Sequence, residues 1–332
     1  MRKIKIAQIG TSRYSHGNDI LNSLRKQKDL FDVVGYVLPE REKEKFPEKL
    51  KGFQGLREMT LEEILADPEI EAVTIETEEI YLSRYALMAA EHGKHIHMEK
   101  PGGVCSEDFT RLIQRIRQNR TVFHTGYMYR YNPCVKEALN MIREGKLGRI
   151  ISVEAQMNTC HHSIERQWLE NFPGGNMFFL GCHLVDFILQ VKGMPEQILP
   201  LHRSTGIQGI TSEDFAMAVL CYPDGNCMVK TAANEVGSRR HLVVSGTRGT
   251  LVIDPVELWS DGSGLQAQMK FYEQYGTTVQ VQEINSEIFD RYDEMMASFA
   301  AIVRGEKENP WTLDYEHALY RTVLECCGAS EK

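Results

Sequence analysis

The chain has 332 residues, of which 42% are hydrophobic and 25% are charged. These proportions are those of an ordinary globular protein, so they exclude disordered, collagen-like and coiled-coil chains. This length suggests two domains, each large enough to bury its own core. The formal net charge is −8 and the basic residues are scattered, so we expect no nucleic-acid partner.

Hydropathy and cysteine usage narrow the class further. No apolar run approaches the ~20 residues that a membrane-spanning helix needs, so we expect no membrane contact. The N-terminal residues lack the long apolar stretch and the cleavage site of a signal peptide. The eight cysteines include no C-x-x-C spacing and are predicted to be reduced thiols. We therefore expect a cytoplasmic protein.

The first 125 residues alternate between strand and helix patterns. Strands are predicted over residues 4–9, 31–37, 72–75, 94–98 and 121–125. Helices are predicted over residues 18–28 and 106–119. Another helix is predicted to begin at the capping box formed by residues 60–63, and a further one follows the third strand and ends at residue 92. This alternation is typical of a doubly wound parallel sheet, whose ligands bind beyond the carboxyl ends of the strands. Residues 1–125 are therefore predicted to form a doubly wound α/β domain.

The pattern changes after residue 125. Helices are predicted over 133–144, 182–191, 286–304 and 313–326, with a strand over 149–156. Most segments from 196 to 283 are short and strand-like, with turns at Pro223-Asp224-Gly225 and Thr247-Arg248-Gly249. Residues 126–332 are therefore predicted to form a second, α+β domain on a mainly antiparallel open sheet.

The loop between the first strand and the first helix has the sequence Gly10-Thr11-Ser12-Arg13-Tyr14-Ser15. It lies where a dinucleotide-binding G-x-G-x-x-G motif would be, but only the first glycine is present. Its backbone N–H groups could bind a pyrophosphate, or it could be a plain turn. Leu38 occupies the usual place of a ribose-binding acid, and Glu40 and Arg41 follow it.

Two further motifs carry side chains suited to proton transfer. Lys100, in Glu99-Lys100-Pro101, follows a strand and is held out of helix by the proline. It either faces the ligand crevice or is a solvated strand end. His183 and Asp186 are three residues apart on one predicted helix. The imidazole is either a general base or a core histidine capped by the aspartate.

Other histidines and tyrosines give weaker evidence for a functional site. Cys160, His161 and His162 are adjacent, and adjacent residues on a strand point to opposite faces, so no metal site is predicted. Tyr127, Tyr129 and Tyr131 alternate on a segment expected to be extended, with Arg130 between them. They could line a sugar or nicotinamide pocket, or pack at the junction of the domains.

Five segments together resemble the Gfo/Idh/MocA family of nicotinamide-dependent sugar and polyol oxidoreductases. They are GKHIHMEKPGG (93–103), GYMYRYNP (126–133), GKLGRIISVEA (145–155), GGNMFFLGCHLVDFIL (174–189) and GTRGTLVID (246–254). The resemblance covers nearly the whole chain. It implies an N-terminal Rossmann domain and a C-terminal domain whose open sheet forms a homodimer or homotetramer.

The resemblance also implies the active site. Lys100 and His183 match the catalytic lysine and histidine of the family, which exchange a hydride between a secondary alcohol carbon and the nicotinamide. We expect NAD as the cofactor and leave NADP open. The residues expected to contact the cofactor are Gly10, Thr11, Ser12, Tyr14, Leu38, Thr77, Glu99, Pro101 and Trp168. The residues expected to contact a small sugar or polyol substrate are Tyr127, Arg130, His161, His162 and Asp186.

One departure bears on activity. Phe179 stands where the family usually carries an aspartate, four residues before the histidine. Loss of that carboxylate would lower the basicity of His183 and free its orientation; Glu154, Glu165 or Asp186 could substitute. Two alternatives to a dehydrogenase therefore stay open. One is a non-catalytic sensor of a sugar or nucleotide, and the other is a relative that cleaves glycosides with tightly held NAD.

Overall fold

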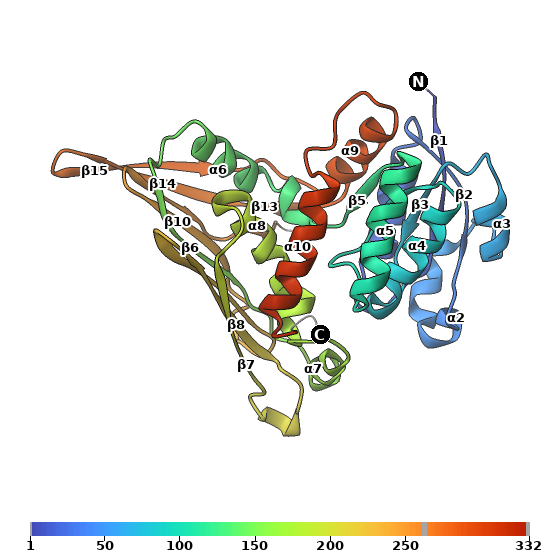
Figure 1. The fold of residues 1–332 in the computed structure, drawn as a ribbon, viewed down its shortest axis with the longest axis horizontal. Coiled ribbons are helices and arrows are strands. Elements are labelled where there is room, and N and C mark those ends of the chain that lie inside the picture. The colour runs from blue at the N-terminus through green and yellow to red at the C-terminus, as the bar shows by residue number, and fades with distance from the viewer. Residues whose placement is uncertain (1, 261–263, 330–332) are drawn as a thin grey trace. The chain divides into compact units, whose positions relative to one another are not determined.

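The computed structural model describes residues 2–260 and 264–329, which divide into two compact units (Figure 1). Unit 1 comprises Met1–Tyr127 and Tyr292–Tyr320, and unit 2 comprises Met128–Arg291 and Arg321–Lys332. The segment 292–320, which the sequence assigned to the second domain, thus groups with unit 1. Its helix α9 (Asp293–Val303) packs on α1 (Gly17–Lys26), where the Ser23 hydroxyl donates to Asp293 Oδ1 at 2.7 Å.

Unit 1 contains a five-stranded parallel sheet in the order β2-β1-β3-β4-β5. Its strands are β1 (Ile4–Ile9), β2 (Phe31–Val37), β3 (Ala72–Ile75), β4 (His95–Met98) and β5 (Phe123–Thr125). The order runs outward from β1 on both sides, as in a doubly wound fold. The predicted fold class is confirmed for this half of the chain.

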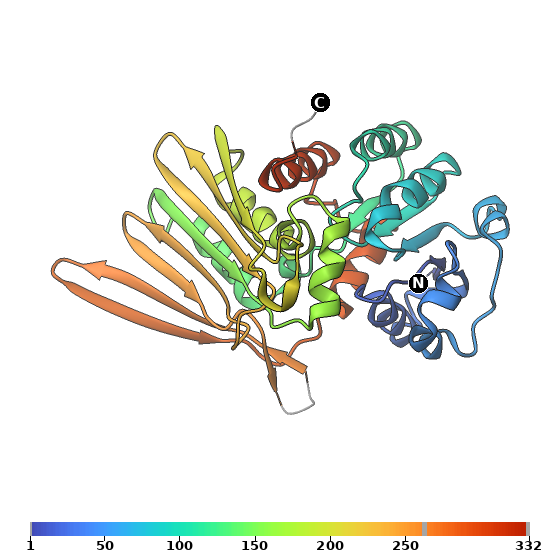
Figure 2. The ribbon, with the colours of Figure 1, turned by 90° about the horizontal axis from the view of Figure 1, so that it is seen from below.

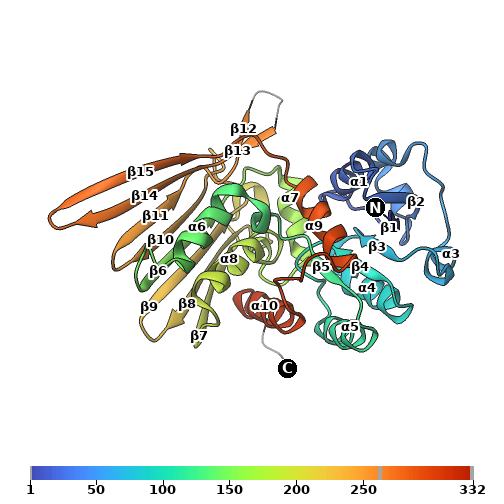
Figure 3. The same ribbon diagram turned by 90° about the horizontal axis from the view of Figure 1, so that it is seen from above.

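Helices cover both faces of this sheet. On one face α4 (Leu82–Glu91) packs beside α5 (Ser106–Asn119), and α1 and α9 lie on the other (Figure 3). The short helix α3 (Leu61–Ala66) begins at the predicted capping box, in which Thr60 Oγ1 accepts from the Glu63 N–H at 3.1 Å. Apolar residues of β1 and β3 are almost fully buried, so the sheet forms the core.

Unit 2 contains an eight-stranded sheet in the order β15-β14-β11-β10-β6-β9-β8-β7 (Figure 2). All neighbours are antiparallel except β6 and β9, which confirms the predicted mainly antiparallel sheet. Its strands are β6 (Ile150–Met157), β7 (Gln197–Arg203), β8 (Phe215–Tyr222), β9 (Gly225–Ala232), β10 (Arg240–Gly246), β11 (Gly249–Ile253), β14 (Gln268–Tyr275) and β15 (Thr278–Asn285). A small separate sheet pairs β12 (Leu258–Ser260) with β13 (Gly264–Gln266).

Two helices lie on one face of the large sheet (Figure 3). They are α6 (Pro133–Arg143) and α8 (Cys182–Lys192), and α8 packs on β6 and β9. A π-helical turn (Met177–Gly181) leads directly into α8. The shorter α7 (Ser163–Trp168) precedes it, and α10 (Leu313–Cys326) runs from unit 1 into unit 2.

Three local predictions were wrong or incomplete. Met128–Tyr131 forms a 3-10 turn instead of an extended segment. The predicted helix 286–304 begins only at Asp293, because the preceding residues bond to the β12–β13 region, where the Phe289 N–H donates to the Leu265 oxygen at 2.9 Å. The helical turns α2 (Glu42–Lys45) and Pro47–Phe53 were not predicted. In the residues described, every helix is too short or too polar to span a membrane.

Candidate active site

The backbone of the loop after β1 lies very close to the segment that follows β3. Gly10 has φ +88°, and a Cβ added there would lie 2.3 Å from Thr77 Cγ2. Only glycine fits this position, because a side chain would be strained and would collide with the segment after β3. The structure therefore brings together Gly10 and Thr77, two of the residues expected to contact a cofactor.

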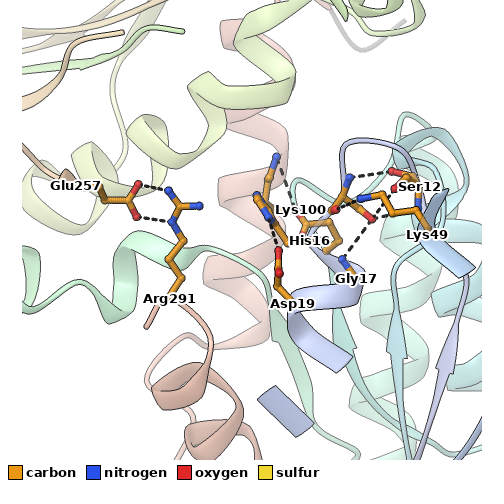
Figure 4. A network of polar contacts seen from close by, with 10 residues as sticks. Ser12, His16, Gly17, Asp19, Lys49, Lys100, Glu257 and Arg291 are labelled. Atoms are coloured by element: carbon orange, nitrogen blue, oxygen red, sulfur yellow. Dashed lines mark hydrogen bonds and ion pairs between the residues drawn. The ribbon is translucent and has the colours of Figure 1, made fainter. Parts of the chain in front are cut away.

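Two serines stand where the sequence lacks the second and third glycines. The Ser12 N–H donates to Ser15 Oγ and the Ser15 N–H donates to Ser12 Oγ, both at 3.1 Å. Lys49 adds a cation beside this loop, with Nζ 3.2 Å from the Ser15 carbonyl oxygen (Figure 4). The reciprocal bonds hold the turn closed in front of the N-terminus of α1. This gives a defined turn without the missing glycines.

The amide of Thr11 is bound by a buried carboxyl group from α2. Its N–H donates to Glu42 Oε2 at 3.0 Å, and Glu42 is fully buried. Burial raises the pKa of Glu42 to about 9, which the Thr11 hydrogen bond partly opposes. Glu42 thus ties the β2–α2 connection to the first loop. It escaped the sequence analysis because nothing in the local sequence distinguishes Glu42 from its neighbour Glu44, which is exposed.

The end of β2 carries charges that are already paired. Glu40 Oε1 accepts from the Tyr85 hydroxyl at 2.7 Å and from Arg84 at 3.1 Å. Arg41 Nε donates to the Glu44 carboxylate at 2.8 Å. Leu38 packs against the apolar cluster of Leu21, Tyr36 and Phe53. Glu40 is the first carboxylate that follows β2 in the chain.

Lys100 is buried, as is the carboxylate next to it. It is 3% exposed, and its Nζ lies 3.7 Å from Glu99 Oε1. A Cβ on Gly126 would lie 2.9 Å from Glu99 Oε2, so the glycine after β5 leaves room for this carboxylate. The Lys100–Pro101 peptide bond is cis. The reading of Lys100 as a solvated strand end is wrong.

Two buried carboxyl groups that follow β3, the strand beside β4, were missed by the sequence analysis. Glu76 and Glu79 follow β3 and are 0% and 1% exposed. Burial raises the pKa of Glu76 well above its ordinary value and that of Glu79 to about 7, where Lys100 lowers it. The signal was available: four buried residues are followed by Glu-Thr-Glu-Glu at the sheet edge where ligands bind.

In unit 2, His183 lies in the first turn of α8 and is 2% exposed. The ring of Tyr129 packs against it, with centroids 5.5 Å apart. Tyr129 is itself 2% exposed, and burial raises the pKa of its hydroxyl. The imidazole is therefore oriented by an aromatic neighbour from the 3-10 turn.

Arg130 and Asp186 bind each other. Arg130 Nε and Nη2 donate to the two Asp186 oxygens at 3.0 and 2.8 Å, and both side chains are almost fully buried. Gln190 donates to Asp186 Oδ2 at 3.0 Å. This bidentate pair joins the turn at residues 128–131 to α8, one helical turn from His183.

Phe179 belongs to an aromatic cluster. Its ring centroid is 5.0 Å from that of Trp168 and 6.5 Å from that of Phe172, and Trp168 is 4.7 Å from Phe172. Phe179 is 8% exposed, in the π-helical turn before α8. An aromatic packing partner thus occupies the position at which the family resemblance leads one to expect a carboxylate.

Two further residues predicted to contact substrate, His161 and His162, directly precede α7. His161 Nδ1 is 3.2 Å from Glu165 Oε2, burial lowers the pKa of His161, and His162 is exposed. In the residues described, no group of three His, Cys, Asp or Glu side chains is arranged to hold a metal ion. The sequence analysis missed Glu257, whose carboxylate binds Arg291 at 2.7 Å (Figure 4). The same carboxylate binds Arg240 at 2.8 Å.

Unit 1 has the features that a dinucleotide requires. A close backbone approach at Gly10, a tight turn and the N-terminus of the ten-residue helix α1 together suit a pyrophosphate. Lys49 supplies a cation at the same turn. The residues present therefore fit a nicotinamide dinucleotide, held by the first loop and by the segments after β2, β3 and β4.

Comparison with known proteins agrees with this reading. Residues 4–127 match the family model described as an oxidoreductase family with an NAD-binding Rossmann fold, and residues 135–252 match the Gfo/Idh/MocA C-terminal domain. Trans-1,2-dihydrobenzene-1,2-diol dehydrogenase from Bos taurus is 28% identical over 206 residues, which are 60% of this chain and 59% of that protein. The first curated relatives are matched over 57% and 59% of their length.

Solved structures share the fold over the whole chain. UDP-N-acetylglucosamine 3-dehydrogenase from Acidithiobacillus ferrooxidans superposes with a TM-score of 0.77 at 17% identity, covering 99% of this chain and 98% of that one. A 3-ketoreductase from Actinomadura kijaniata, solved with TDP-benzene and NADP, gives a TM-score of 0.75 at 15% identity, covering 97% and 96%. The two units define a Rossmann-fold oxidoreductase. The chain belongs to the Gfo/Idh/MocA family.

Proposed function

We propose that this protein transfers a hydride between a nicotinamide dinucleotide and a secondary alcohol or ketone of a sugar, glycoside or cyclitol. The observation that carries the proposal is the placement of Lys100. It is buried beside Glu99 at the carboxyl end of β4, in the sheet whose first loop suits a dinucleotide. A desolvated ammonium at this edge is suited to polarise a substrate oxygen.

The chain's own residues divide the work between binding and proton transfer. The cofactor supplies the hydride chemistry when it is bound. Lys100 would donate a hydrogen bond to the reacting oxygen, and His183 would take the hydroxyl proton, a contribution of roughly 10²- to 10⁴-fold. The Arg130–Asp186 pair and Tyr129 would orient α8 and the imidazole. Tyr127, His161 and His162 remain the proposed substrate contacts.

We propose NAD as the preferred cofactor. Support comes from the connection after β2, which carries the Glu40 carboxylate; ribose hydroxyls would join Tyr85 and Arg84 as donors to this carboxylate. Arg84 binds Glu40 and Arg41 binds Glu44, so both nearby arginines already have a carboxylate partner. A 2′-phosphate would have to compete with these carboxylates. We expect NADP(H) to bind at least about tenfold more weakly than NAD(H), and Glu40→Gln to narrow that difference.

The test combines cofactor binding with turnover. Calorimetry measures NAD(H) affinity, and nicotinamide absorbance follows reaction with a panel of polyols, sugars and glycosides. Lys100→Ala should lower turnover by about 10³-fold or more, and its affinity for NAD(H) should stay close to that of the natural protein. Lys5→Ala, which removes an exposed lysine paired with Glu69, is the matched control and should leave both quantities unchanged. Failure to bind either NAD(H) or NADP(H) would refute the proposal.

Phe179 favours one alternative, a sensor that keeps the scaffold without catalysis. Its aromatic contacts with Trp168 and Phe172 occupy a position where the resemblance leads one to expect a catalytic carboxylate. A sensor would bind cofactor or sugar and give no absorbance change with any substrate. A relative that cleaves glycosides would instead release product with no net cofactor consumption. The same panel separates these outcomes.

A further inference from the structure

Two arginines share one buried carboxylate in unit 2. Arg291 binds both oxygens of Glu257, with Nε–Oε1 and Nη2–Oε2 distances of 2.7 Å (Figure 4). Arg240 Nη1 donates to Glu257 Oε2 at 2.8 Å. The Glu257 side chain is 4% exposed, and those of Arg240 and Arg291 are 21% and 14% exposed. Because two guanidinium groups bind one carboxylate, the three side chains together carry a net positive charge.

Arg240 is the cation that this arrangement leaves over. The Arg291–Glu257 contact is a complete bidentate pair, which is the strongest arrangement of these two groups. A guanidinium has several N–H donors, and Arg240 uses its Nη1 for Glu257. Among the described residues, no second carboxylate forms an ion pair with Arg240. A partly buried cation of this kind is suited to bind an anion that comes from outside the chain.

Strand alternation places Arg240 on the face of the large sheet that the helices cover. Leu242 and Val244, the next alternate residues of β10, are each 1% exposed. Because alternate residues of a strand point to the same face, the Arg240 side chain points to that buried face as well. β10 pairs with β6, on which α8 packs, and α8 carries His183 in its first turn. Arg240 and His183 therefore lie on the same side of the sheet.

Backbone hydrogen bonds connect Arg240 to the turn that carries Tyr129. The Val256 N–H donates to the Arg240 carbonyl oxygen at 3.2 Å, and the Val256 carbonyl oxygen accepts from Asn132 Nδ2 at 2.8 Å. The Asn132 N–H donates to the Tyr129 carbonyl oxygen at 3.2 Å. The ring of Tyr129 packs against that of His183, with centroids 5.5 Å apart. These bonds hold Tyr129, and with it His183, beside the strand end that carries Arg240.

The Tyr129 hydroxyl is a buried donor that lacks an acceptor. Tyr129 is 2% exposed, and among the described residues no acceptor lies within hydrogen-bond distance of its hydroxyl oxygen. Burial raises the pKa of this hydroxyl, and Arg240 is the charged group that opposes the rise most. The phenol therefore keeps its proton and lies near the Arg240 guanidinium. Buried donors are normally satisfied, so this one indicates that a group from outside the chain completes the site.

His161 adds an acceptor for a hydroxyl group. Its Nδ1 lies 3.2 Å from Glu165 Oε2, so this nitrogen carries the proton of the neutral ring. Burial lowers the pKa of His161; Glu165 opposes this shift and Arg240 adds to it. His161 Nε2 is buried and has no hydrogen-bond partner among the residues that the structure describes. The same part of unit 2 thus offers a cation, a hydroxyl donor and a ring acceptor.

We infer that Arg240 binds an anionic group of the substrate, a carboxylate or a phosphate, and that the Tyr129 hydroxyl donates to the same group. This inference rests on the proposed function and narrows its substrates to sugar acids or sugar phosphates. Arg291 and Glu257 hold the Arg240 guanidinium in place, and His161 accepts a hydrogen bond from a ring hydroxyl. A neutral sugar leaves the Tyr129 hydroxyl without a charged acceptor, so it binds more weakly.

The first test measures ligand binding without turnover. Calorimetry compares D-glucuronate, D-galacturonate and glucose 6-phosphate with D-glucose and D-galactose, in the presence and in the absence of NADH. We expect at least one anionic sugar to bind at least about tenfold more tightly than its neutral parent. Whether the tighter ligand is a sugar acid or the sugar phosphate shows which anion the site takes. Added salt should weaken that binding and leave the binding of the neutral sugar unchanged.

Variants test whether Arg240 causes the preference. Arg240→Gln should lower the affinity for the preferred anion roughly 10- to 100-fold and leave that for the neutral parent unchanged, and Arg240→Lys should restore part of the loss. Arg239→Gln is the matched control, since the neighbouring Arg239 is 62% exposed and binds Asp254 at 2.6 Å. Tyr129→Phe should lower the affinity for the anion about fivefold. Circular dichroism checks that each variant is folded.

The outcomes separate this inference from the proposed function. Equal affinity for anionic and neutral sugars in the natural protein would overturn the inference, and so would the failure of every anionic sugar to bind. A preference for anions that persists in folded Arg240→Gln would overturn it as well. If the preference depends on Arg240 but no sugar changes the nicotinamide absorbance, the proposed function fails and the anion site at Arg240 stands.

Discussion

Buried charges are treated differently in the two units. In unit 2, Arg130 binds Asp186 and Arg166 binds Asp214 at 2.8 and 2.9 Å, so each buried charge has its opposite. In unit 1, Glu76 and Glu79 are equally buried, but their oxygens have no hydrogen-bond partner among the described residues. The first arrangement fixes a geometry. The second favours the neutral acid, because burial raises the pKa of a carboxyl group that has no hydrogen-bond donor.

The largest effect should come from breaking a paired charge. Asp186→Ala leaves the Arg130 guanidinium buried without its carboxylate, and we expect a loss of about 3 to 5 kcal/mol in unfolding free energy. Urea unfolding followed by circular dichroism measures it. Arg130→Met combined with Asp186→Leu should recover much of the loss. A cost below about 1 kcal/mol for Asp186→Ala would mean that the pair does not hold α8.

A smaller effect is expected at the first loop of unit 1. Gly10→Ala introduces a Cβ 2.3 Å from Thr77 Cγ2 at φ +88°, so it should cost about 3 kcal/mol and weaken NAD(H) binding at least about tenfold. Gly93→Ala is the matched control, since it has φ +71° and nothing within 4 Å. Thermal unfolding and calorimetry compare the two. Equal costs at both positions would show that the Thr77 contact does not matter.

The buried carboxyl group of Glu42, which binds the Thr11 amide, should make the free energy of unfolding depend on pH. Glu42 has a folded pKa of about 9 against an ordinary value of 4.5, so the folded state binds more protons between these values. Its contribution is therefore full below about pH 4.5 and is lost as pH rises toward 9. As pH rises from about 5 to about 8, the free energy of unfolding of Glu42→Gln should increase relative to that of the natural protein by on the order of 2 kcal/mol. Glu44→Gln should show no such change.

The smallest effect is expected on the surface. Lys5 and Glu69 form an exposed ion pair on unit 1. Replacement of either by alanine should change unfolding free energy by less than about 0.5 kcal/mol, and less again in high salt. Denaturant titration at two salt concentrations measures it. A cost comparable to that of Asp186→Ala would remove the distinction between exposed and buried pairs.

Sequence patterns located most of the fold because buried parallel strands are apolar runs with clear stops. The predicted 4–9, 31–37 and 72–75 match β1, β2 and β3 at both ends. Prediction failed where distant residues decide the backbone. The segment before Asp293 carries a helical pattern, but Phe289 pairs with Leu265 instead. Tertiary hydrogen bonds override the local helix propensity of this segment.

The candidate site was predictable only where a motif marks it. Lys100 and His183 were found through the E-K-P and G-x-H-x-x-D patterns. Glu42 and Glu79 were not, because a glutamate after a strand or at a helix start is ordinarily solvated, and its burial depends on elements far along the chain. Arg130 and Asp186 bind each other, which the sequence did not indicate, and their predicted contact with substrate stays a prediction.

Calorimetric titration of NAD⁺ and NADH tests most directly whether unit 1 holds a nicotinamide dinucleotide. We predict saturable binding of one dinucleotide per chain, in the micromolar range (Kd of order 10⁻⁶ M, about −8 kcal/mol), and its weakening in Gly10→Ala. Absence of any heat of binding for NAD(H) and NADP(H) up to millimolar concentration, in a protein that is folded, would contradict the account.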